Sequence, residues 1–358
     1  MEKFGFVGLP NAGKSSLYNA LTGGSALAAP YAFATTDPNV GVAKVFDDRL
    51  AALAEMSKSK KIVHATVQFN DIGGLVAGAS KGEGLGNKFL AGIREVDAIV
   101  FVLRAFTDED VPGPHDPLEH LAIVETELTL ADLETVEKQI DKKRKAARAD
   151  RELQPEVDAA DAALAILSEG TPLYRSNLSA EHRALLRPWF LLTNKPVLAI
   201  VNIDEEQLAD VDGIVAPVEE ALGGIAPVFG ACVQLEAEAA QLEAEDRAEM
   251  LDAYGLGEGS LPKFIQAAYH VLGLRTFLTT GEQETRAWTY RVGSTAPECA
   301  GKIHSDLQRG FIRAETIRWD ELVQIGSIAK AKEIGKVRSE GKEYIVEDGD
   351  VLDIRFNV

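Results

Sequence analysis

Cysteine is scarce in this chain, and its scarcity excludes two kinds of structure. Only Cys232 and Cys299 occur among the 358 residues, far apart and without a paired spacing. A disulfide scaffold and a cysteine-based zinc site both need more thiols at short intervals. We therefore expect two reduced cysteines.

Long apolar runs are also missing. The longest strongly apolar stretch, around Ala98 to Leu103, is far shorter than the roughly 20 residues with which a helix crosses a bilayer. The segment from Met1 to Gly8 has no basic part followed by a long apolar part and a cleavage site, so we expect no secretory signal. These absences predict a cytoplasmic protein with no membrane partner.

Positive charge is in short supply. The chain has 37 Lys and Arg against 56 Asp and Glu, which gives a net charge of -19. Such a charge repels phosphate backbones at long range unless basic residues cluster locally, so we expect no sequence-specific DNA partner. The 46% hydrophobic and 26% charged residues are typical of a soluble globular protein. We expect a monomer of two or three domains, because a domain usually takes roughly 150 residues.

What is present is an alternation of short β-branched or aromatic runs with helical stretches. It predicts parallel strands joined by crossover helices, so the fold class is α/β. The strands are expected at Phe4–Val7, Ile62–Asn70, Ala98–Leu103, Val197–Val201 and Ile225–Ala231. Ligand loops in such sheets follow the carboxyl ends of the strands.

A long charged interval with helical periodicity separates the third and fourth of these strands. Two apolar stripes lie on either side of a break near Gln154–Pro155, and they consist of Leu133, Val136 and Ile140, then Val157, Ala160, Leu164 and Leu167. The spacing predicts two antiparallel, coiled-coil-like helices. Basic residues gather near their turn, namely Lys138, Lys142, Lys143, Arg144, Lys145, Arg148 and Arg151. They form either a solvated helical face or a contact surface.

The pattern changes after Gly273. Short strands are expected at Thr289–Val292, Phe311–Ile312, Tyr344–Val346 and Val351–Phe356, with a turn at Asp348-Gly349-Asp350. The sequence therefore predicts a separate small α+β domain.

The segment Gly8-Leu9-Pro10-Asn11-Ala12-Gly13-Lys14-Ser15 satisfies the phosphate-loop pattern GxxxxGK(S/T), after an expected strand and before the helical run Ser16–Leu21. Glycines let backbone N–H groups turn toward a phosphate, and the helix N-terminus that follows favours negative charge. Lys14 would reach the β and γ phosphates. The Ser15 hydroxyl would bind Mg²⁺, which prefers oxygen ligands.

The segment Asp71-Ile72-Gly73-Gly74-Leu75 has the spacing DxxG at a strand end. Beside a phosphate loop, this motif places Asp71 to hold magnesium through water and the Gly74 N–H to meet the γ-phosphate. Thr35, favoured over Thr36, is a candidate for magnesium and the γ-phosphate. Alone, both segments are equally consistent with ordinary turns. Small GTPases often have a glutamine where Leu75 stands, and leucine cannot orient the attacking water, so slow hydrolysis is expected.

The segment Asn202-Ile203-Asp204-Glu205 follows the strand Val197–Val201, where a guanine-binding protein is expected to have Asn-Lys-x-Asp. The lysine is missing, and the acid is one methylene longer. A short carboxylate is fixed for a bidentate hydrogen bond with guanine, whereas a longer one is mispositioned. Guanine preference is therefore expected to be lost or relaxed.

Together these segments resemble the Obg-like ATPases, the YchF family of P-loop proteins, over nearly the whole chain. Further matching segments are Gly82–Leu90, Thr126–Leu133, Gly310–Glu315 and Asp348–Val351. The resemblance implies a G-domain-like nucleotide-binding domain split by the helical insertion and followed by a ubiquitin-like TGS domain. The limits would be 1–125 and 190–273 for the nucleotide-binding domain, 126–189 for the insertion and 274–358 for the TGS domain.

The resemblance also implies ATP as the substrate in preference to GTP, a need for Mg²⁺, and association with the ribosome or its subunits. By position, the phosphates would be held by Asn11, Ala12, Gly13, Lys14, Ser15 and Ser16. The base contacts would come from Asn202, Ile203, Glu205, Cys232 and Val233. Magnesium would be held by Ser15, Thr35 and Asp71, while Lys14 and Gly74 would act at the γ-phosphate.

One loop departs from the family pattern. The family usually has a histidine followed by Val-x-Gly after the third strand, a candidate for handling the attacking water, whereas this chain reads Asp110-Val111-Pro112-Gly113-Pro114-His115. Either His115 takes this catalytic role by a small loop shift, or the role is lost and His115 is a surface residue.

The leading functional hypothesis is a slow regulatory ATPase whose nucleotide state, ATP or ADP, sets its affinity for the ribosome. A GTPase switch is the closest enzymatic alternative. A nucleotide-stabilised module that binds RNA or protein with little catalysis is the third candidate. It is motivated by the basic residues near the helical turn and by a second cluster, Lys330, Lys332, Lys336 and Arg338.

Overall fold

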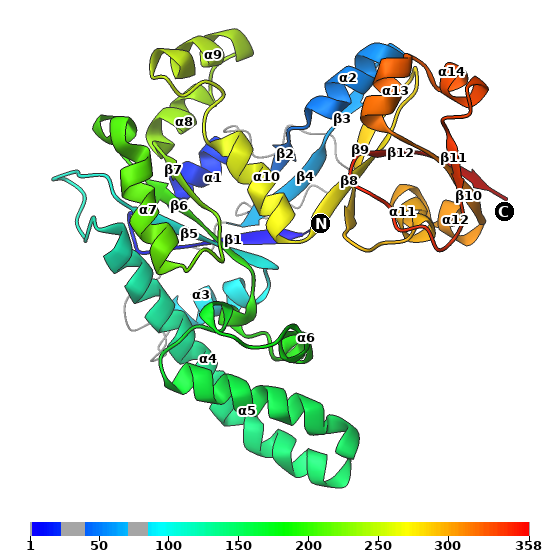
Figure 1. Cartoon of the computed structure of the whole chain (residues 1–358). Coiled ribbons are helices and arrows are strands. Elements are labelled where there is room, and N and C mark those ends of the chain that lie inside the picture. The colour runs from blue at the N-terminus through cyan, green and yellow to red at the C-terminus, as the bar shows by residue number, and fades with distance from the viewer. Residues whose placement is uncertain (1, 23–39, 71–84, 358) are drawn as a thin grey trace. The chain divides into compact units, whose positions relative to one another are not determined.

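The structure is a computed structural model that describes residues 2–22, 40–70 and 85–357 (Figure 1). Within these residues the chain forms two compact units. One unit combines the described parts of Met1–Ala43 with Gln68–Phe264, and the other combines Lys44–Val67 with Ile265–Val358. The second unit therefore includes an early segment that the sequence alone assigned to the nucleotide-binding part.

The first sheet has six strands in the order β2-β4-β1-β5-β6-β7. They are β1 (Lys3–Val7), β2 (Val40–Val45), β4 (Ala65–Asn70), β5 (Ala98–Arg104), β6 (Val197–Asn202) and β7 (Val228–Ala231). The pairings from β4 through β1, β5 and β6 to β7 are all parallel. The predicted α/β class is confirmed, and the carboxyl ends of β1, β5, β6 and β7 meet at one edge of the sheet.

Continuous hydrophobicity explains the two central strands. β5 and β6 are buried at every position, as expected of parallel strands covered on both faces. The helices of this part of the chain are α1 (Lys14–Thr22), α3 (Leu85–Arg94), α4 (Pro117–Ala149), α5 (Gln154–Ser168), α6 (Ala180–Leu185), α7 (Val211–Ala221), α8 (Val233–Ala239), α9 (Ala244–Ala253) and α10 (Leu261–Val271). Val124 and Leu128 of α4 share a core cluster with Phe101 and Leu103 of β5, so the first half of α4 is anchored on the sheet.

The predicted helical hairpin is confirmed. A 3-10 turn at Arg151–Leu153 joins α4 to α5, so the break falls where the sequence indicates it. Figure 1 shows the two helices side by side, and Val136 and Ile140 share a core cluster with Ala160 of α5. At the base of the hairpin, the Asp132 carboxylate accepts hydrogen bonds from the backbone N–H groups of Leu192 (2.8 Å) and Thr193 (2.7 Å) and from the Thr193 hydroxyl (2.7 Å).

The second unit contains the other six-stranded sheet, in the order β11-β10-β12-β8-β9-β3. Its strands are β3 (Ile62–Val63), β8 (Leu274–Thr279), β9 (Thr285–Arg291), β10 (Phe311–Arg318), β11 (Arg338–Glu340) and β12 (Asp350–Phe356). Its helices are α2 (Asp48–Ser57), α11 (Ala296–Ile303), α12 (Ser305–Arg309), α13 (Trp319–Ile325) and α14 (Ile328–Glu333). Phe277, Tyr290 and Ala300 belong to its core cluster, which gives the C-terminal residues the predicted α+β character.

Three strand predictions are wrong in detail. Ile62–Asn70 is not one strand, because β3 pairs with β9 while β4 pairs with β1 in the other sheet. The last strand of the first sheet begins at Val228 rather than Ile225, after a turn in which Gly223 and Gly224 have positive φ. Tyr344–Val346 forms only an isolated bridge between Ile345 and Thr295. None of the described helices is both long and apolar enough to cross a membrane.

Candidate nucleotide-binding site

The loop between β1 and α1 has the turned backbone that a phosphate loop needs. Asn11 and Gly13 both have positive φ, 62° and 95°. The Ala12 N–H donates to the Leu9 carbonyl (3.3 Å), and α1 begins at Lys14. The buried Lys14 ammonium donates to the carbonyls of Gly8 (3.1 Å) and Leu9 (2.7 Å), so the positive charge lies within the curve of the loop.

Two glycines in this loop are required by close contacts, and Gly13 is required by its positive φ as well. A Cβ on Gly8 would lie 2.4 Å from the Val102 carbonyl oxygen of β5, and a Cβ on Gly13 would lie 2.2 Å from the Asn202 side-chain nitrogen. Any side chain at either position would therefore push the loop away from β5 or β6. The glycines of the motif thus set how closely the phosphate loop packs on the sheet.

A cavity of about 1080 Å³ opens beside this loop at the carboxyl edge of the first sheet. It is lined by the loops that follow β1, β5, β6 and β7, as expected for a ligand site of a parallel sheet. Most residues predicted to contact nucleotide line it, namely Asn11, Gly13, Lys14, Ser15, Ser16, Asn202, Ile203, Glu205, Cys232 and Val233. Ala12 is a fully buried residue of the loop, and its carbonyl accepts a hydrogen bond from the Asn202 side chain.

The Asn202 side chain connects three of these loops. Its amide N–H donates to the Ala12 carbonyl of the phosphate loop (3.1 Å), and its Oδ1 accepts from the Val233 N–H at the start of α8 (3.2 Å). The side chain is buried, and it ends β6. The contact predicted for Asn202 is with the base, and the structure adds that Asn202 ties the phosphate loop to the segment around Cys232.

The Ile203–Glu205 segment also lines the cavity. Ile203 is buried, whereas Glu205 is exposed, lines the cavity and has no side-chain hydrogen bond among the described residues. Asp204 instead accepts from the N–H groups of Gln207 (3.0 Å) and Thr107 (3.3 Å), which fixes the loop in place. The segment therefore offers one carboxylate, that of Glu205, to a bound base.

Cys232 and Val233 line the cavity too, and both are buried. Burial raises the pKa of the Cys232 thiol, and the carboxylates of Glu205 and Asp204 oppose ionisation further. Cys232 is therefore a protonated, unreactive thiol near neutral pH, which agrees with the expectation of a reduced cysteine.

Arg104 is a structural element of the site that the sequence did not indicate. Its guanidinium, almost fully buried, donates to the carbonyls of Phe106 (3.1 Å), Val111 (3.1 Å) and Asp108 (3.4 Å) and lies 4.5 Å from the centre of the Phe106 ring. Phe106, Asp108 and Val111 line the cavity together with Thr107. A single side chain from β5 thus holds the loop that forms one wall.

The two histidines that follow this loop differ in position. His115 is exposed and is not among the residues that line the cavity, so its catalytic role stays a prediction. His120, which the sequence did not single out, is buried in the first turn of α4, and its Nε2 donates to the Pro114 carbonyl (2.7 Å). Burial lowers the pKa of His120, so this ring is neutral at pH 7 and fixes the end of the loop.

The predicted magnesium ligands are only partly described. Ser15 lines the cavity next to Lys14, which fits an oxygen ligand beside bound phosphates. Thr35, Asp71 and Gly74 lie outside the described residues. Among the residues that the structure does describe, no group of three or more acidic, His or Cys side chains is placed to hold a metal ion.

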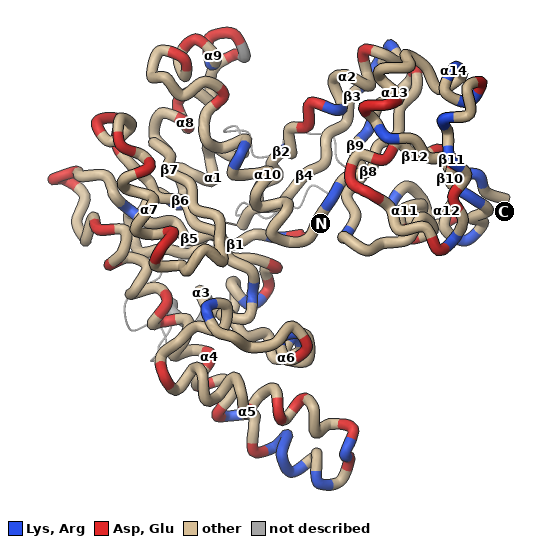
Figure 2. The backbone as a smooth tube through the Cα atoms, in the orientation of Figure 1, with Lys and Arg blue, Asp and Glu red and all other residues tan. Residues whose placement is uncertain are grey.

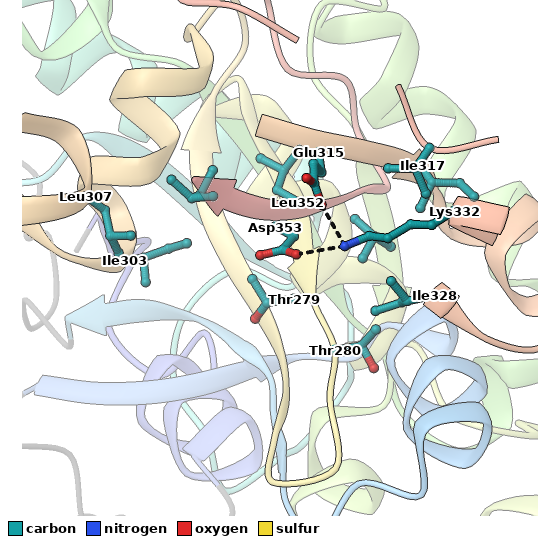
Figure 3. Close-up of a pocket in the computed structure, with 13 residues that line it drawn as sticks. Thr279, Thr280, Ile303, Leu307, Glu315, Ile317, Ile328, Lys332, Leu352 and Asp353 are labelled. Atoms are coloured by element: carbon teal, nitrogen blue, oxygen red, sulfur yellow. Dashed lines mark hydrogen bonds and ion pairs between the residues drawn. The ribbon is translucent and has the colours of Figure 1, made fainter. Parts of the chain in front are cut away.

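A second, smaller cavity of about 390 Å³ lies in the second unit, between the sheet and helices α12 and α14 (Figure 3). Its lining is mostly aliphatic. Its one cation, Lys332, forms ion pairs with Glu315 (2.6 Å) and Asp353 (3.5 Å), as the dashed lines in Figure 3 indicate. These groups satisfy one another, so the cavity offers no unpaired charge to a ligand.

Comparison with known proteins places these features in a family. The model MMR_HSR1, described as 50S ribosome-binding GTPase, matches residues 3–203, and YchF-GTPase_C, described as a protein of unknown function, matches residues 274–357. The chain is 48% identical to the "Ribosome-binding ATPase YchF" of Bacillus subtilis and 44% identical to that of Haemophilus influenzae, with 99% of each chain covered in both cases. The solved structure of the Schizosaccharomyces pombe YchF GTPase superposes with a TM-score of 0.88 at 32% identity, covering 99% of this chain and 97% of that one.

Proposed function

This chain belongs to the YchF family, and from that premise we propose that it is a ribosome-binding ATPase that converts ATP and water to ADP and phosphate with Mg²⁺. The observation that carries the proposal is the shared cavity, in which a phosphate loop faces a base-side segment lacking the Asn-Lys-x-Asp pattern. We extend the proposal to the domain limits predicted above, with a TGS domain at 274–358.

The phosphate side of the cavity supports triphosphate binding. Lys14 brings a positive charge to the loop, and the N-terminal end of α1 faces the same space, so both favour the β and γ phosphates. Bound magnesium would neutralise the charge that develops on the phosphate oxygens, with Ser15, Thr35 and Asp71 as its proposed protein ligands. In the reaction, water adds to the γ-phosphorus while the bond to the β–γ bridging oxygen breaks.

We propose slow turnover because the residues expected near the attacking water are poorly suited to orient it. Gly74 would donate its N–H to the γ-phosphate, but Leu75 beside it cannot orient water. His115 is exposed outside the cavity lining. We propose that ATP persists long enough for the nucleotide state to control partner binding, through the segments that hold Thr35 and Asp71.

The base side supports adenine over guanine. Ile203 replaces the lysine of the guanine pattern and is buried, so it offers the base an apolar surface. Glu205 presents a flexible carboxylate on an exposed position rather than a short, fixed one. The names of the relatives differ, since the Bacillus subtilis protein is called an ATPase and the Schizosaccharomyces pombe protein a GTPase. The geometry of this segment favours ATP.

Calorimetric titration with ATP, ADP, GTP and GDP in the presence of Mg²⁺ tests the assignment. We expect the adenine nucleotides to bind at least as tightly as the guanine nucleotides. We also expect Lys14→Ala to lower ATP turnover by about 100-fold or more without unfolding the chain, because the residue acts at the charge that develops in the transition state. A clear guanine preference would retire the ATP assignment, and unchanged turnover in Lys14→Ala would remove the site itself.

Ribosome pelleting with ATP, ADP or no nucleotide tests the regulatory part. A nucleotide-dependent fraction in the pellet supports the switch. Equal binding in all three conditions would favour the third candidate, a nucleotide-stabilised binding module with little catalysis.

A further inference from the structure

The turn between α4 and α5 carries an unusual charge for this protein. Residues 138–151 contain seven Lys or Arg and two Asp in a chain of net charge -19. Figure 2 shows these basic residues gathered around the turn of the helical hairpin, while the helices α7, α8 and α9 carry mostly acidic ones. We propose that this turn binds the phosphate backbone of RNA, and that it is the surface through which the chain contacts ribosomal RNA.

The basic residues of the hairpin divide into two groups. Three of them are used within the fold, because Lys138 pairs with Glu134, Lys143 with Glu156 (2.6 Å), and Arg144 with Asp141 and Asp161. The other four are exposed and make no side-chain hydrogen bond or ion pair with any described residue. We call these four the tip cations, and they are Lys142, Lys145, Arg148 and Arg151.

The arrangement of the tip cations suits a polyanion. Lys142, Lys145 and Arg148 follow one another at intervals of three residues on α4, so successive charges are about 4.5 Å apart along the helix axis. Arg151 continues the row into the 3-10 turn. The row therefore presents regularly spaced charges on flexible side chains, which can follow the phosphates of a nucleic acid strand.

Helix stabilisation does not account for the row. A cation interacts favourably with the helix dipole only within the last turn, and of the four only Arg148 lies in the last turn of α4. The acids of α5 that lie opposite are already engaged, since Glu156 binds Lys143 and the Trp189 indole, and Asp158 binds Gln154. The tip cations are therefore exposed, and none of them is paired with a side chain in the described ranges.

The second basic cluster of the sequence does not share this property. Lys332 is paired with Glu315 and Asp353, Lys336 with Glu321 (2.9 Å), and Arg338 with Asp350 (3.3 Å). Only Lys330 among them has no ion pair with a described residue. The structure therefore separates two clusters that look alike in the sequence, and it leaves the hairpin turn as the surface with available charge.

RNA is favoured over a protein partner by the nature of the surface. The tip cations are surrounded by polar and charged residues, and the apolar side chains of the hairpin, such as Val136 and Ile140, are buried in its own seam. A protein interface normally needs an apolar centre, whereas phosphate contacts need only positioned cations. Naming ribosomal RNA as the partner rests on the proposed function, but binding to RNA as such does not.

The test compares two variants of the full chain that lose the same charge. The tip variant is Lys142→Gln/Lys145→Gln/Arg148→Gln/Arg151→Gln. The control variant changes four exposed lysines that likewise have no side-chain ion pair with a described residue, Lys263→Gln/Lys302→Gln/Lys330→Gln/Lys342→Gln. Because none of the eight side chains makes such a contact, we expect unchanged thermal unfolding and ATP turnover in both.

Binding is measured by fluorescence anisotropy with a labelled 20-base-pair RNA hairpin over a salt series, and by ribosome pelleting. Four phosphate contacts predict that the slope of log K against log salt is smaller in magnitude by about 3 to 4 in the tip variant, equivalent to about a hundredfold between 50 and 200 mM salt. The control variant should keep the wild-type slope and the wild-type pelleting.

Three results would overturn the proposal: a tip variant that binds RNA like the wild type, equal losses in both variants, or loss of pelleting with intact RNA binding, which would assign the turn to a ribosomal protein. The wild-type protein could bind the labelled RNA through the tip cations and yet neither hydrolyse ATP nor pellet with ribosomes. That result would refute the proposed function and leave the RNA-binding surface supported.

Discussion

Replacing Asn202 by alanine should weaken ATP binding, because this side chain ties the phosphate loop to the segment around Cys232. The side chain donates to Ala12 of the phosphate loop and accepts from the Val233 N–H, so its removal leaves both backbone groups without this partner. Each such hydrogen bond contributes about 1 kcal/mol net. The loss of two therefore predicts about 2 kcal/mol, or about a 30-fold higher Kd for ATP.

Asn202→Asp separates the two bonds. The carboxylate keeps an acceptor for the Val233 N–H, but it places an oxygen where the amide had donated to the Ala12 carbonyl, at 3.1 Å in the wild type. Two acceptors then oppose each other, and a negative charge stands near the phosphates. We expect Asn202→Asp to bind ATP more weakly than Asn202→Ala does.

Calorimetric titration with ATP and Mg²⁺ measures both variants against Glu206→Gln. Glu206 is an exposed residue of the same cavity with no side-chain hydrogen bond among the described residues, so its variant should stay within about threefold of the wild type. If Asn202→Ala also stays within threefold while folding normally, Asn202 does not hold the phosphate loop in its binding form, and the reasoning is wrong.

Four further changes test other parts of the structure. Gly13→Ala should raise the Kd for ATP by at least about tenfold, because its Cβ would meet Asn202 and its φ of 95° adds strain of about 1–3 kcal/mol. The control in calorimetry is Gly113→Ala, where φ is 113° and an added Cβ has no atom within 4 Å. Equal effects of the two changes on the Kd would contradict the contact argument. Ile203→Lys/Glu205→Asp rebuilds the guanine pattern and should shift the ratio of GTP to ATP affinity by about tenfold or more, so an unchanged ratio would show that this segment does not select the base. His115→Ala should leave ATP turnover within about threefold, since the exposed ring is outside the cavity lining, and a large loss would restore its catalytic assignment. Burial raises the pKa of Asp132 from 3.8 to about 6, so the protonated form stabilises the fold fully below pH 3.8, and this stabilisation is lost as the pH rises through 6. The free energy of unfolding should change by about 3 kcal/mol over this range. Urea titration should find this change in the wild type and not in Asp132→Asn.

The parts of the site that the sequence predicted are those encoded by adjacent residues. The phosphate loop was recognisable because its glycines, Lys14 and Ser15 must occur at fixed spacing to wrap one group. The Asn202–Glu205 segment was recognisable by comparison with a pattern of the same length. In both cases the chemistry is local, so the structure places the residues together as expected.

Arg104 could not be predicted, because its role depends on where its side chain ends rather than on its neighbours in the sequence. It is the last residue of a buried strand, and in the sequence a single arginine at this place indicates only that the strand ends. Only the fold shows that the guanidinium turns back to bind carbonyls up to eight residues later, from Phe106 to Pro112. A motif search has no signal for such a contact, although the position at the carboxyl end of a central strand marks the region.

The strand errors have a similar origin. Ile62–Asn70 is a continuous β-prone run, yet Ile62 and Val63 pair with Thr285 and Arg286, more than 200 residues away, whereas residues after His64 pair with β1. Tyr344–Val346 is equally β-prone, but the Tyr344 hydroxyl donates to the buried Asp350 carboxylate (2.7 Å) and the Arg338 guanidinium lies 5.4 Å from its ring centre. In the first case a strand more than 200 residues away decides the conformation, and in the second case side-chain contacts six residues away accompany it. Local β propensity carries no information about either partner.

Helix α4 connects the two ends of the proposed activity. Its first turn holds His120, which binds the loop wall of the nucleotide cavity through Pro114, and its last turn carries Arg148 among the tip cations. As a helix of 33 residues it is about 50 Å long. Asp132 fixes its middle to Leu192 and Thr193. The turn that we propose as the RNA-binding surface therefore stands on a helix whose first half is fixed to the sheet of the nucleotide cavity by Val124 and Leu128.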